Sequence, residues 1–379
     1  MIIALEKRFQ ELHPEVKVKD INVTSGEHRA VIKTMLLGGE TVDLIFSAWP
    51  SFDKELHDAG LLVPIDTAWQ QYGWDKSLNE SWKKLGTIEG KIYGAWYLAD
   101  NRSGVWYDVK TFEKLGLSVP ATWDEFRSVA RAYKEAGMVP IILGAKIWAH
   151  TDVFENLLLR VGGPEMYMKL AWHEIPWNHQ VVRNALKRWQ ELLTEGLFPD
   201  ANTMLATDWF GAFQQVIDTK TAGLNLMGSW VNVRAQQEFK LVPGEDYNFF
   251  QFPVIDPKLP KNTTEISGKD WLVTKTGKNR DAAFLFIDFV LSREGGGIIA
   301  EYGSGTPNRL VPLEQYDAVM SEIVKLFAAN EVVFVLDDLL PSELSNEFRT
   351  QLQKFLMTPT DETIETVMAA IEQKAKEVY

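Results

Sequence analysis

The chain has 379 residues, of which 46% are hydrophobic and 24% are charged, so it is long enough for two globular domains with substantial cores. Its net charge of −13 argues against a general nucleic-acid binder and against a protein held on anionic lipid by charge. The absence of cysteine excludes thiolate catalysis, zinc–cysteine sites and iron–sulfur clusters.

The first hundred residues alternate between two patterns. Apolar residues at helical spacing predict helices over 1–13, 28–39 and 51–60, and period-two or apolar runs predict strands over 16–23, 42–48, 91–98 and 103–108. This alternation predicts an α/β domain. No apolar run approaches the ~20 residues of a membrane span, and Met1 opens directly into the first helix without a signal peptide.

From Lys110 onward the pattern becomes mainly helical. We expect helices over 111–117, 122–137, 151–163 and 178–196, with two short strands over 139–145 and 222–228. Thr122 followed by Glu125 predicts a capping box at the start of the second of these helices. Near Thr264 the chain turns strand-like over 266–275, a helix follows over 279–294, and the part from Leu313 on is almost all helical. Such an order predicts a chain that leaves one domain and returns to it.

Two short motifs resemble catalytic signatures and fail on spacing. His173 and His179 are six residues apart with Pro176 between them, whereas a metalloprotease helix needs histidines at i and i+4; a loop entering a helix capped by Asn178 is the better interpretation. The glycines of residues 294–298 lack the lysine and hydroxyl of a phosphate loop and indicate a helix junction.

Carboxylates near aromatic residues leave one enzymatic alternative. A glycosidase needs two acids about 5–10 Å apart around a sugar, and the sequence offers Asp100, Asp152, Asp208 and Asp270. Acyl transfer has no support, because the chain has neither a Gly-x-Ser-x-Gly elbow nor a cysteine nucleophile. Tryptophan is unusually frequent, with 14 residues, many of them next to polar side chains.

Residues 104–126, GVWYDVKTFEKLGLSVPATWDEF, resemble a hallmark of the solute-binding proteins (family 1) of bacterial ABC sugar importers. That family has an apolar strand ending in Tyr-Asn or Tyr-Asp, a short helix, and then Pro-x-Thr-Trp-Asp/Glu-Glu. Further segments resemble the family in the same order along the chain, namely residues 4–18, 42–66, 90–97, 185–200, 222–231, 268–295 and 303–312.

The resemblance implies a fold of two α/β lobes, the periplasmic-binding-protein fold, with a hinge of several chain crossings and a helical C-terminal part. The N-terminal lobe would comprise residues 1–108 and 265–311, and the C-terminal lobe residues 109–264 and 312–379. In the family, ligand lies in the cleft and the lobes close on it. The family also begins with a signal peptide and a central strand; neither is present here, so the first lobe is expected to lack that strand.

Sugar sites combine aromatic faces, which stack on pyranose rings, with planar polar side chains that bind hydroxyls. By resemblance, Asp100, Asn101 and Arg102 face the cleft, whereas Trp106 and Tyr107 are strand core. The remaining expected contacts are Trp49, Trp148, His150, Asp208, Trp209, Trp230, Lys269, Asp270, Trp271 and Asn308. Among these, Trp230 is the first candidate for stacking, since the family places an aromatic residue after this strand.

The predicted function is therefore an extracytoplasmic, monomeric binding protein, in the periplasm or lipid-anchored, that does no chemistry. It would capture a mono- or oligosaccharide and deliver it to the permease subunits of an ABC importer, without metal, nucleotide or other cofactor. The alternatives are a glycoside-processing enzyme that uses cleft carboxylates and a sugar sensor of the same fold.

Overall fold

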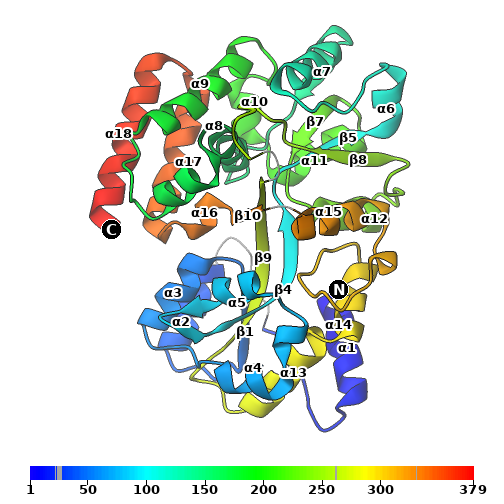
Figure 1. The fold of residues 1–379 in the computed structure, drawn as a ribbon, viewed down its shortest axis with the longest axis vertical. Coiled ribbons are helices and arrows are strands. Elements are labelled where there is room, and N and C mark those ends of the chain that lie inside the picture. Colours follow the sequence, from blue (N-terminus) through cyan, green and yellow to red (C-terminus); the bar gives the residue numbers. More distant parts are fainter. Residues whose placement is uncertain (22, 24–27, 261–262, 330) are drawn as a thin grey trace. The chain divides into compact units, whose positions relative to one another are not determined.

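A computed structural model describes residues 1–21, 23, 28–260, 263–329 and 331–379 of the chain. The chain divides into two compact units, each built from two segments (Figure 1). Unit 1 comprises residues Met1–Asp100 and Gly268–Ser321, and unit 2 comprises residues Asn101–Ser267 and Glu322–Tyr379. The chain therefore passes between the units three times.

Unit 1 is a mixed α/β unit. Its helices are α1 (Ile2–Leu12), α2 (His28–Leu37), α3 (Pro50–Asp58), α4 (Asp66–Tyr72), η1 (Trp74–Lys76), α5 (Glu80–Leu85), α13 (Arg280–Val290), α14 (Arg293–Glu301) and η2 (Leu313–Gln315). Its strands are β1 (Leu44–Ser47), β2 (Thr87–Ile88), β3 (Lys91–Ile92), most of β4 (Gly94–Asn101) and the second part of β9 (Thr263–Val273). The helix α15 (Ala318–Ala329) contains the third passage between the units.

Unit 2 combines a sheet with a helical C-terminal part. Its strands are β5 (Gly104–Asp108), β6 (Val139–Ile141), β7 (Ala222–Leu226), β8 (Tyr247–Gln251) and β10 (Glu331–Phe334). Its helices are α6 (Val109–Lys114), α7 (Trp123–Glu135), α8 (Thr151–Ala171), α9 (Gln180–Thr194), α10 (Ala201–Ala206), α11 (Trp209–Ile217), α12 (Val231–Gln237), α16 (Leu336–Leu339), α17 (Ser342–Met357) and α18 (Asp361–Val378). Figure 1 shows α17 and α18 side by side, with α9 against α18.

The strand β9 takes part in both units. Its first residues pair in parallel with β10, from Thr263 opposite Glu331 to Ile266 opposite Phe334. Its last residues pair antiparallel with β1, where Asp270 lies opposite Ser47 and Trp271 opposite Phe46. The other sheet of unit 2 has the order β6-β7-β5-β8. Because β5 pairs with β7 and β8, it belongs to unit 2, whereas the sequence assigned residues up to Asp108 to the first lobe.

The capping box predicted from Thr122 and Glu125 is confirmed. The Thr122 hydroxyl accepts from the Glu125 backbone N–H at 3.3 Å, and the Glu125 carboxylate accepts from the Thr122 backbone N–H at 3.0 Å. The cap fixes the start of α7, whose buried face includes Phe126 and Tyr133. Tyr133 lies over Gly223 of β7, where any side chain would overlap the Tyr133 ring. The cap thus fixes where α7 begins, and Tyr133 on the same helix packs against β7 at a position that only glycine can occupy.

Some local predictions were wrong. The described residues of the expected strand 16–23 form no strand, and Asn22 lies outside the described part of the chain. The helix α9 is capped by His179, whose ring nitrogen accepts from Val181, and not by Asn178. The glycines of residues 295–297 lie inside α14, where Gly295 and Gly296 allow close approach of Phe289 and Val311.

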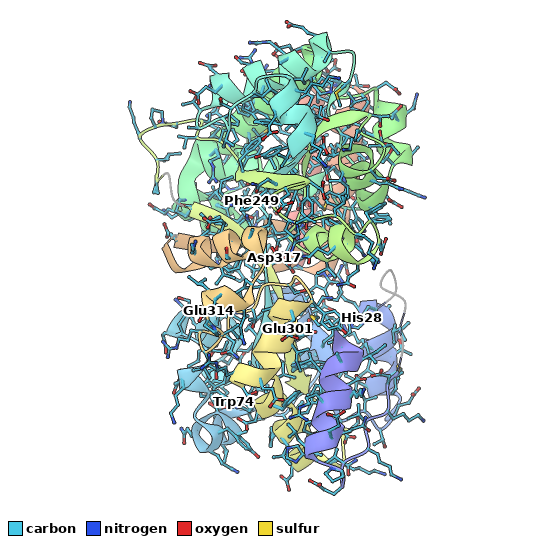
Figure 2. All side chains as sticks on the ribbon, turned by 90° about the vertical axis from the view of Figure 1, so that its right-hand side faces the viewer. His28, Trp74, Phe249, Glu301, Glu314 and Asp317 are labelled. Atoms are coloured by element: carbon cyan, nitrogen blue, oxygen red, sulfur yellow. The ribbon has the colours of Figure 1, made fainter. Side chains whose placement is uncertain are left out.

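The core of unit 1 brings α2, α3, β1 and β9 together. Its buried members are Ile32, Leu36, Val42, Ile45, Phe52, Leu56, Leu62, Tyr93 and Leu272, and Trp49 packs against this cluster from a partly buried position. A second aromatic group surrounds Trp74, labelled in Figure 2, which stacks on Tyr72 and donates to Asp288 at 3.0 Å. Among the residues that the structure describes, none of the helices has the length and apolarity that a bilayer crossing requires.

Candidate functional site

Three partly buried tryptophans gather at the ends of elements in unit 2. Trp148 lies in the loop between β6 and α8, Trp209 is the first residue of α11, and Trp230 is the N-cap residue of α12. The ring centroids of Trp148 and Trp230 are 5.7 Å apart, and those of Trp209 and Trp230 are 6.1 Å apart with the rings nearly perpendicular. We call Trp148, Trp209 and Trp230 the tryptophan cluster. Three residues distant in sequence thus form one aromatic surface.

The strand β7 determines where Trp230 lies. All five residues of β7 are buried, and the chain leaves the strand through Met227 and Gly228. A side chain at residue 228 would overlap the Trp230 ring, so glycine is required for the indole to fold back over its own backbone. The next residue is held by the segment after β4, because Ser229 N–H donates to the Asn101 carbonyl at 3.0 Å and Asn101 N–H donates to the Ser229 hydroxyl at 3.1 Å.

Arg102 lies against the tryptophan cluster. Its guanidinium carbon is 4.9 Å from the ring centroid of Trp148 and 5.0 Å from that of Trp230, within the range of a cation–π contact. The side chain is buried, and two of its nitrogens donate to the carboxylate of Asp152, one of them at 3.3 Å. The third nitrogen lies 3.9 Å from the carboxylate of Asp338.

The electrostatics of this ion pair follow from burial. Burial opposes the charge on Arg102, but the carboxylates of Asp152 and Asp338 prevail and raise its pKa. Burial raises the pKa of Asp152 to about 6, with Arg102 opposing the shift, so the pair is largely ionised at neutral pH. A buried ion pair of this kind is costly to break from one side only.

Three other predicted contacts of unit 2 are engaged within the fold. Asn101 is buried, and its side-chain oxygen accepts from Ser103 N–H at 2.9 Å, while the described residues offer its amide nitrogen no partner. His150 is buried, its Nε2 lies 2.9 Å from the Arg349 carbonyl, and burial lowers the pKa of the imidazole to about 4. Asp208 is exposed and caps α11 by accepting from Gly211 N–H at 2.7 Å. Trp106 is strand core, fully buried, as expected.

In unit 1 a chain of ring contacts links Trp49 to Lys269. The Trp49 ring lies 5.7 Å from the His28 ring, which lies 4.5 Å from the Phe46 ring, and the Lys269 ammonium is 5.2 Å from the centroid of Phe46. His28, labelled in Figure 2, comes from α2, whereas the other residues come from β1, the loop after it and β9. The Arg29 guanidinium adds a cation 5.1 Å from the Trp49 ring centroid.

Lys269 and Asp100 are opposite charges at the same side of unit 1. Burial lowers the pKa of Lys269, and the carboxylate of Asp100 opposes this shift. Burial likewise lowers the pKa of His28, although its hydrogen bond to the Phe46 carbonyl, at 3.1 Å, favours the protonated form. Both Lys269 and Asp100 are partly buried. Lys269, Asp100 and Trp49 together offer an ammonium, a carboxylate and an indole, which suit the hydroxyls and one ring face of a sugar.

Asp270, Trp271 and Asn308 lie inside unit 1. Asp270 is fully buried and faces the carboxyl of Asp53, and burial raises the pKa of both groups, that of Asp53 to about 7. Trp271 is buried and stacks on Tyr97 with centroids 5.0 Å apart. Asn308 donates to the carbonyls of Leu291 and Ser292, each at 2.8 Å. These contacts account for the three residues by packing and hydrogen bonding.

The described residues contain one group with ligand atoms close enough for a metal ion, His57, Asp58 and Glu89, whose ligand atoms lie within 4.8 Å of one another. Asp58 already accepts from Lys54 at 2.8 Å, and both carboxylates are exposed. The histidines of residues 173–179 do not converge on a metal, because His173 lies 3.1 Å from the Glu372 carboxylate and His179 caps α9. A metal-free function remains a prediction.

Sequence reasoning missed the partners that organise these groups. It named Asp152 only as a possible catalytic acid, whereas the structure gives it the guanidinium of Arg102, 50 residues away in sequence. It did not name His28, Phe46 or Asp338. Asp152 is the second residue of a predicted helix, and that position gives no signal that an arginine fifty residues earlier will pair with it.

Comparison with known proteins defines the class. The model of the bacterial extracellular solute-binding protein family matches residues 2–297, and the chain belongs to this family. An uncharacterized ABC transporter extracellular-binding protein of Pyrococcus horikoshii is 26% identical over 372 residues, which cover 95% of this chain and 82% of that protein. The alpha-glucosides-binding periplasmic protein AglE of Rhizobium meliloti is 27% identical over 346 residues, covering 87% and 74% of the two chains.

Solved structures confirm the fold. The bacterial solute receptor AcbH, described as exclusively preferring β-D-galactopyranose, superposes with a TM-score of 0.89 at 24% identity, over 100% of this chain and 95% of that one. Maltose-bound MalE3 of T. maritima gives a TM-score of 0.79 at 17% identity, over 100% and 96% of the two chains. At these identities the likeness establishes the α/β solute-binding fold predicted from the sequence, and the family and these relatives are binding proteins.

Proposed function

We propose that this protein binds a carbohydrate outside the cytoplasm and delivers it to the permease of an ABC importer. The observation that carries the proposal is the tryptophan cluster of unit 2, in which Trp148, Trp209 and Trp230 are partly buried and so keep part of their ring surface accessible. Indole faces bury the apolar C–H surface of a pyranose ring and leave its hydroxyls for polar groups.

Unit 1 supplies polar groups of the right chemistry. The Lys269 ammonium can donate to a sugar hydroxyl, and the Asp100 carboxylate can accept from one. Trp49 adds a third kind of contact, an aromatic face. We assign ligand contact to Trp49, Asp100, Lys269 and the tryptophan cluster. We leave out His150, Asp208, Asp270, Trp271 and Asn308, because each already has a structural role in its own unit.

The names of relatives support a sugar as the ligand. Besides AglE, a relative in Mesorhizobium japonicum is a probable sugar-binding periplasmic protein, 25% identical over 327 residues. Binding without chemistry is part of the proposal. Of the four acids considered for a glycosidase, Asp152 is paired with Arg102, Asp208 caps a helix and Asp270 is buried against Asp53. Any catalytic pair drawn from these four acids would therefore need at least one of these three carboxyls to leave its partner.

A thermal-shift screen with galactose, maltose, raffinose and trehalose tests the proposal. A sugar that binds only the folded protein at 100 times its Kd adds about 2.7 kcal/mol to the free energy of unfolding. We expect at least one panel sugar to raise the melting temperature and to be recovered intact by chromatography after prolonged incubation. Hydrolysed sugar would favour the enzyme. No shift with any panel sugar, nor with longer oligosaccharides, would refute carbohydrate binding.

A transport protein and a sugar sensor differ in the membrane protein that the sugar-loaded form binds, which is an importer in the first case and a signalling receptor in the second. A transport protein loaded with sugar stimulates the ATPase activity of its importer, so an importer of this family, with its permease and ATPase subunits reconstituted in vesicles, provides the assay. Stimulation that requires both the protein and its sugar is expected. Absence of stimulation, together with sugar-dependent binding to a signalling receptor, would favour the sensor.

A further inference from the structure

Arg102 was expected to bind sugar hydroxyls, but two of its three guanidinium nitrogens already donate to Asp152. The third faces Asp338 at 3.9 Å. Its backbone is equally fixed, since Arg102 N–H donates to the Glu265 carbonyl at 2.8 Å and the Arg102 carbonyl accepts from Asn156 at 3.1 Å. Arg102 is 5% exposed, whereas the tryptophans around it are only partly buried. A ligand therefore meets the indoles before it meets the guanidinium.

The same guanidinium contacts two indole rings at once. Its central carbon lies 4.9 Å from the Trp148 centroid and 5.0 Å from the Trp230 centroid, and the two centroids are 5.7 Å apart. Trp148 comes from a loop between β6 and α8, and Trp230 from the start of α12, so the two rings belong to separate elements and meet only through their side chains. A planar cation held by Asp152 supplies that contact, because guanidinium planes stack on aromatic faces.

We propose that Arg102 is a positioning residue, which sets the spacing and tilt of Trp148 and Trp230 and thereby the shape of the aromatic surface that receives the ligand. This inference rests on the proposed function in one respect, that the cluster binds a sugar. Arg102 acts through the two tryptophans, and Asp152 acts through Arg102. A lysine at this position keeps the charge but lacks the planar fork that binds Asp152 through two nitrogens and stacks on an indole.

The test compares Arg102→Lys with a matched control, Arg160→Lys. Arg160 lies in the same unit, is also 5% exposed and donates to the carbonyls of Phe252 and Thr263 at 3.2 and 2.9 Å, and none of its described contacts is with an aromatic ring. Both variants thus lose a buried guanidinium, but only one of them loses a contact with tryptophan.

The first measurement needs no ligand. Two indoles at this separation couple in the near-ultraviolet circular dichroism spectrum, and the difference between the wild type and Trp148→Phe isolates that contribution. We expect Arg102→Lys to lose most of this signal and Arg160→Lys to retain it. The second measurement is the affinity for the galactose, maltose, raffinose or trehalose that binds the wild type most tightly. We expect Arg102→Lys to weaken it by about tenfold, the scale of losing two cation–π contacts of the strength found at exposed sites, and Arg160→Lys to leave it unchanged.

The outcomes are separable from those of the proposed function. If no panel sugar binds the wild type, the choice of ligand is wrong, while the dichroism comparison still decides whether Arg102 orders the two rings. A retained signal in Arg102→Lys, or equal losses in both lysine variants, would overturn the inference. If Arg102→Lys does not fold, the double variant Arg102→Met with Asp152→Asn removes both charges together, which buried pairs tolerate better, and the same two measurements apply.

Discussion

Replacing Trp230 by alanine separates recognition from packing. In the unliganded protein the ring touches Trp148, Trp209 and Arg102. Each aromatic contact is worth about 0.5–1.5 kcal/mol and the cation–π contact about 0.5–2 kcal/mol. Because the ring is only partly buried, we expect a loss of about 2 kcal/mol in the free energy of unfolding. If the ring stacks on a sugar, binding weakens by about 2 kcal/mol or more, roughly thirtyfold.

Trp189→Ala provides the control for this substitution. Trp189 lies on α9 in the same unit, is fully buried and packs on Phe355, so its truncation should cost about 3–5 kcal/mol of stability without changing the affinity of the folded fraction. Urea denaturation gives the stability of each variant, and calorimetric titration with the best panel sugar gives the affinity. If Trp230→Ala unfolds as readily as the control and its folded fraction binds sugar normally, the indole is packing and our assignment is wrong.

Four further outcomes are expected. The Asp53–Asp270 pair has raised pKa values, so its contribution to stability is full at low pH and lost as pH rises through about 7; Asp270→Asn should therefore lose less melting temperature between pH 5 and 8 than the wild type, and an equal loss would contradict the raised pKa values. His150 has a lowered pKa, so its contribution is full above the ordinary value of 6.5 and lost as pH falls through about 4; His150→Gln should reduce the acid destabilisation by up to about 3 kcal/mol in denaturant titrations, and an unchanged acid limb would argue against a neutral buried imidazole. Thr122→Ala should cost about 1 kcal/mol through loss of the capping bond, whereas Asp124→Ala in the same helical turn should cost less; equal costs would show that the cap contributes nothing specific. Exhaustive EDTA treatment should leave binding of the panel sugar unchanged, and a loss restored by calcium would reveal a metal requirement.

Local patterns in the sequence predicted most of the fold. Helical spacing located α7 and α9, and the capping box placed the start of α7 at the observed residue. Trp230 was predicted as a ligand contact because it follows a buried strand, at the point where the resembled family places an aromatic residue. The strand β10 was missed, since its four residues lie between helices and are recognised as a strand only through pairing with β9.

Long-range partners could not be read from the sequence. The predicted contacts His150 and Asn308 bond to backbone carbonyls of Arg349 and Leu291, acceptors that every residue possesses and no pattern distinguishes. Arg102 was predicted to contact the ligand, but Asp152, Trp148 and Trp230, which three separate elements bring to it, were not predicted as its partners. Periodicity specifies which face of an element is buried; it does not specify what lies against that face.

The split composition of each unit constrains how the chain folds. In unit 1, the Thr274 hydroxyl donates to the Val42 carbonyl across 232 residues of sequence. The strand β1 pairs with the last residues of β9, so it cannot pair until that distant segment has been synthesised. Unit 2 is complete only with α18, the last helix of the chain. During synthesis, therefore, most of the first hundred residues emerge long before the strand that covers them. Contacts between residues far apart in sequence slow folding. The nascent protein is therefore expected to remain a substrate for chaperones until nearly its whole length has been synthesised.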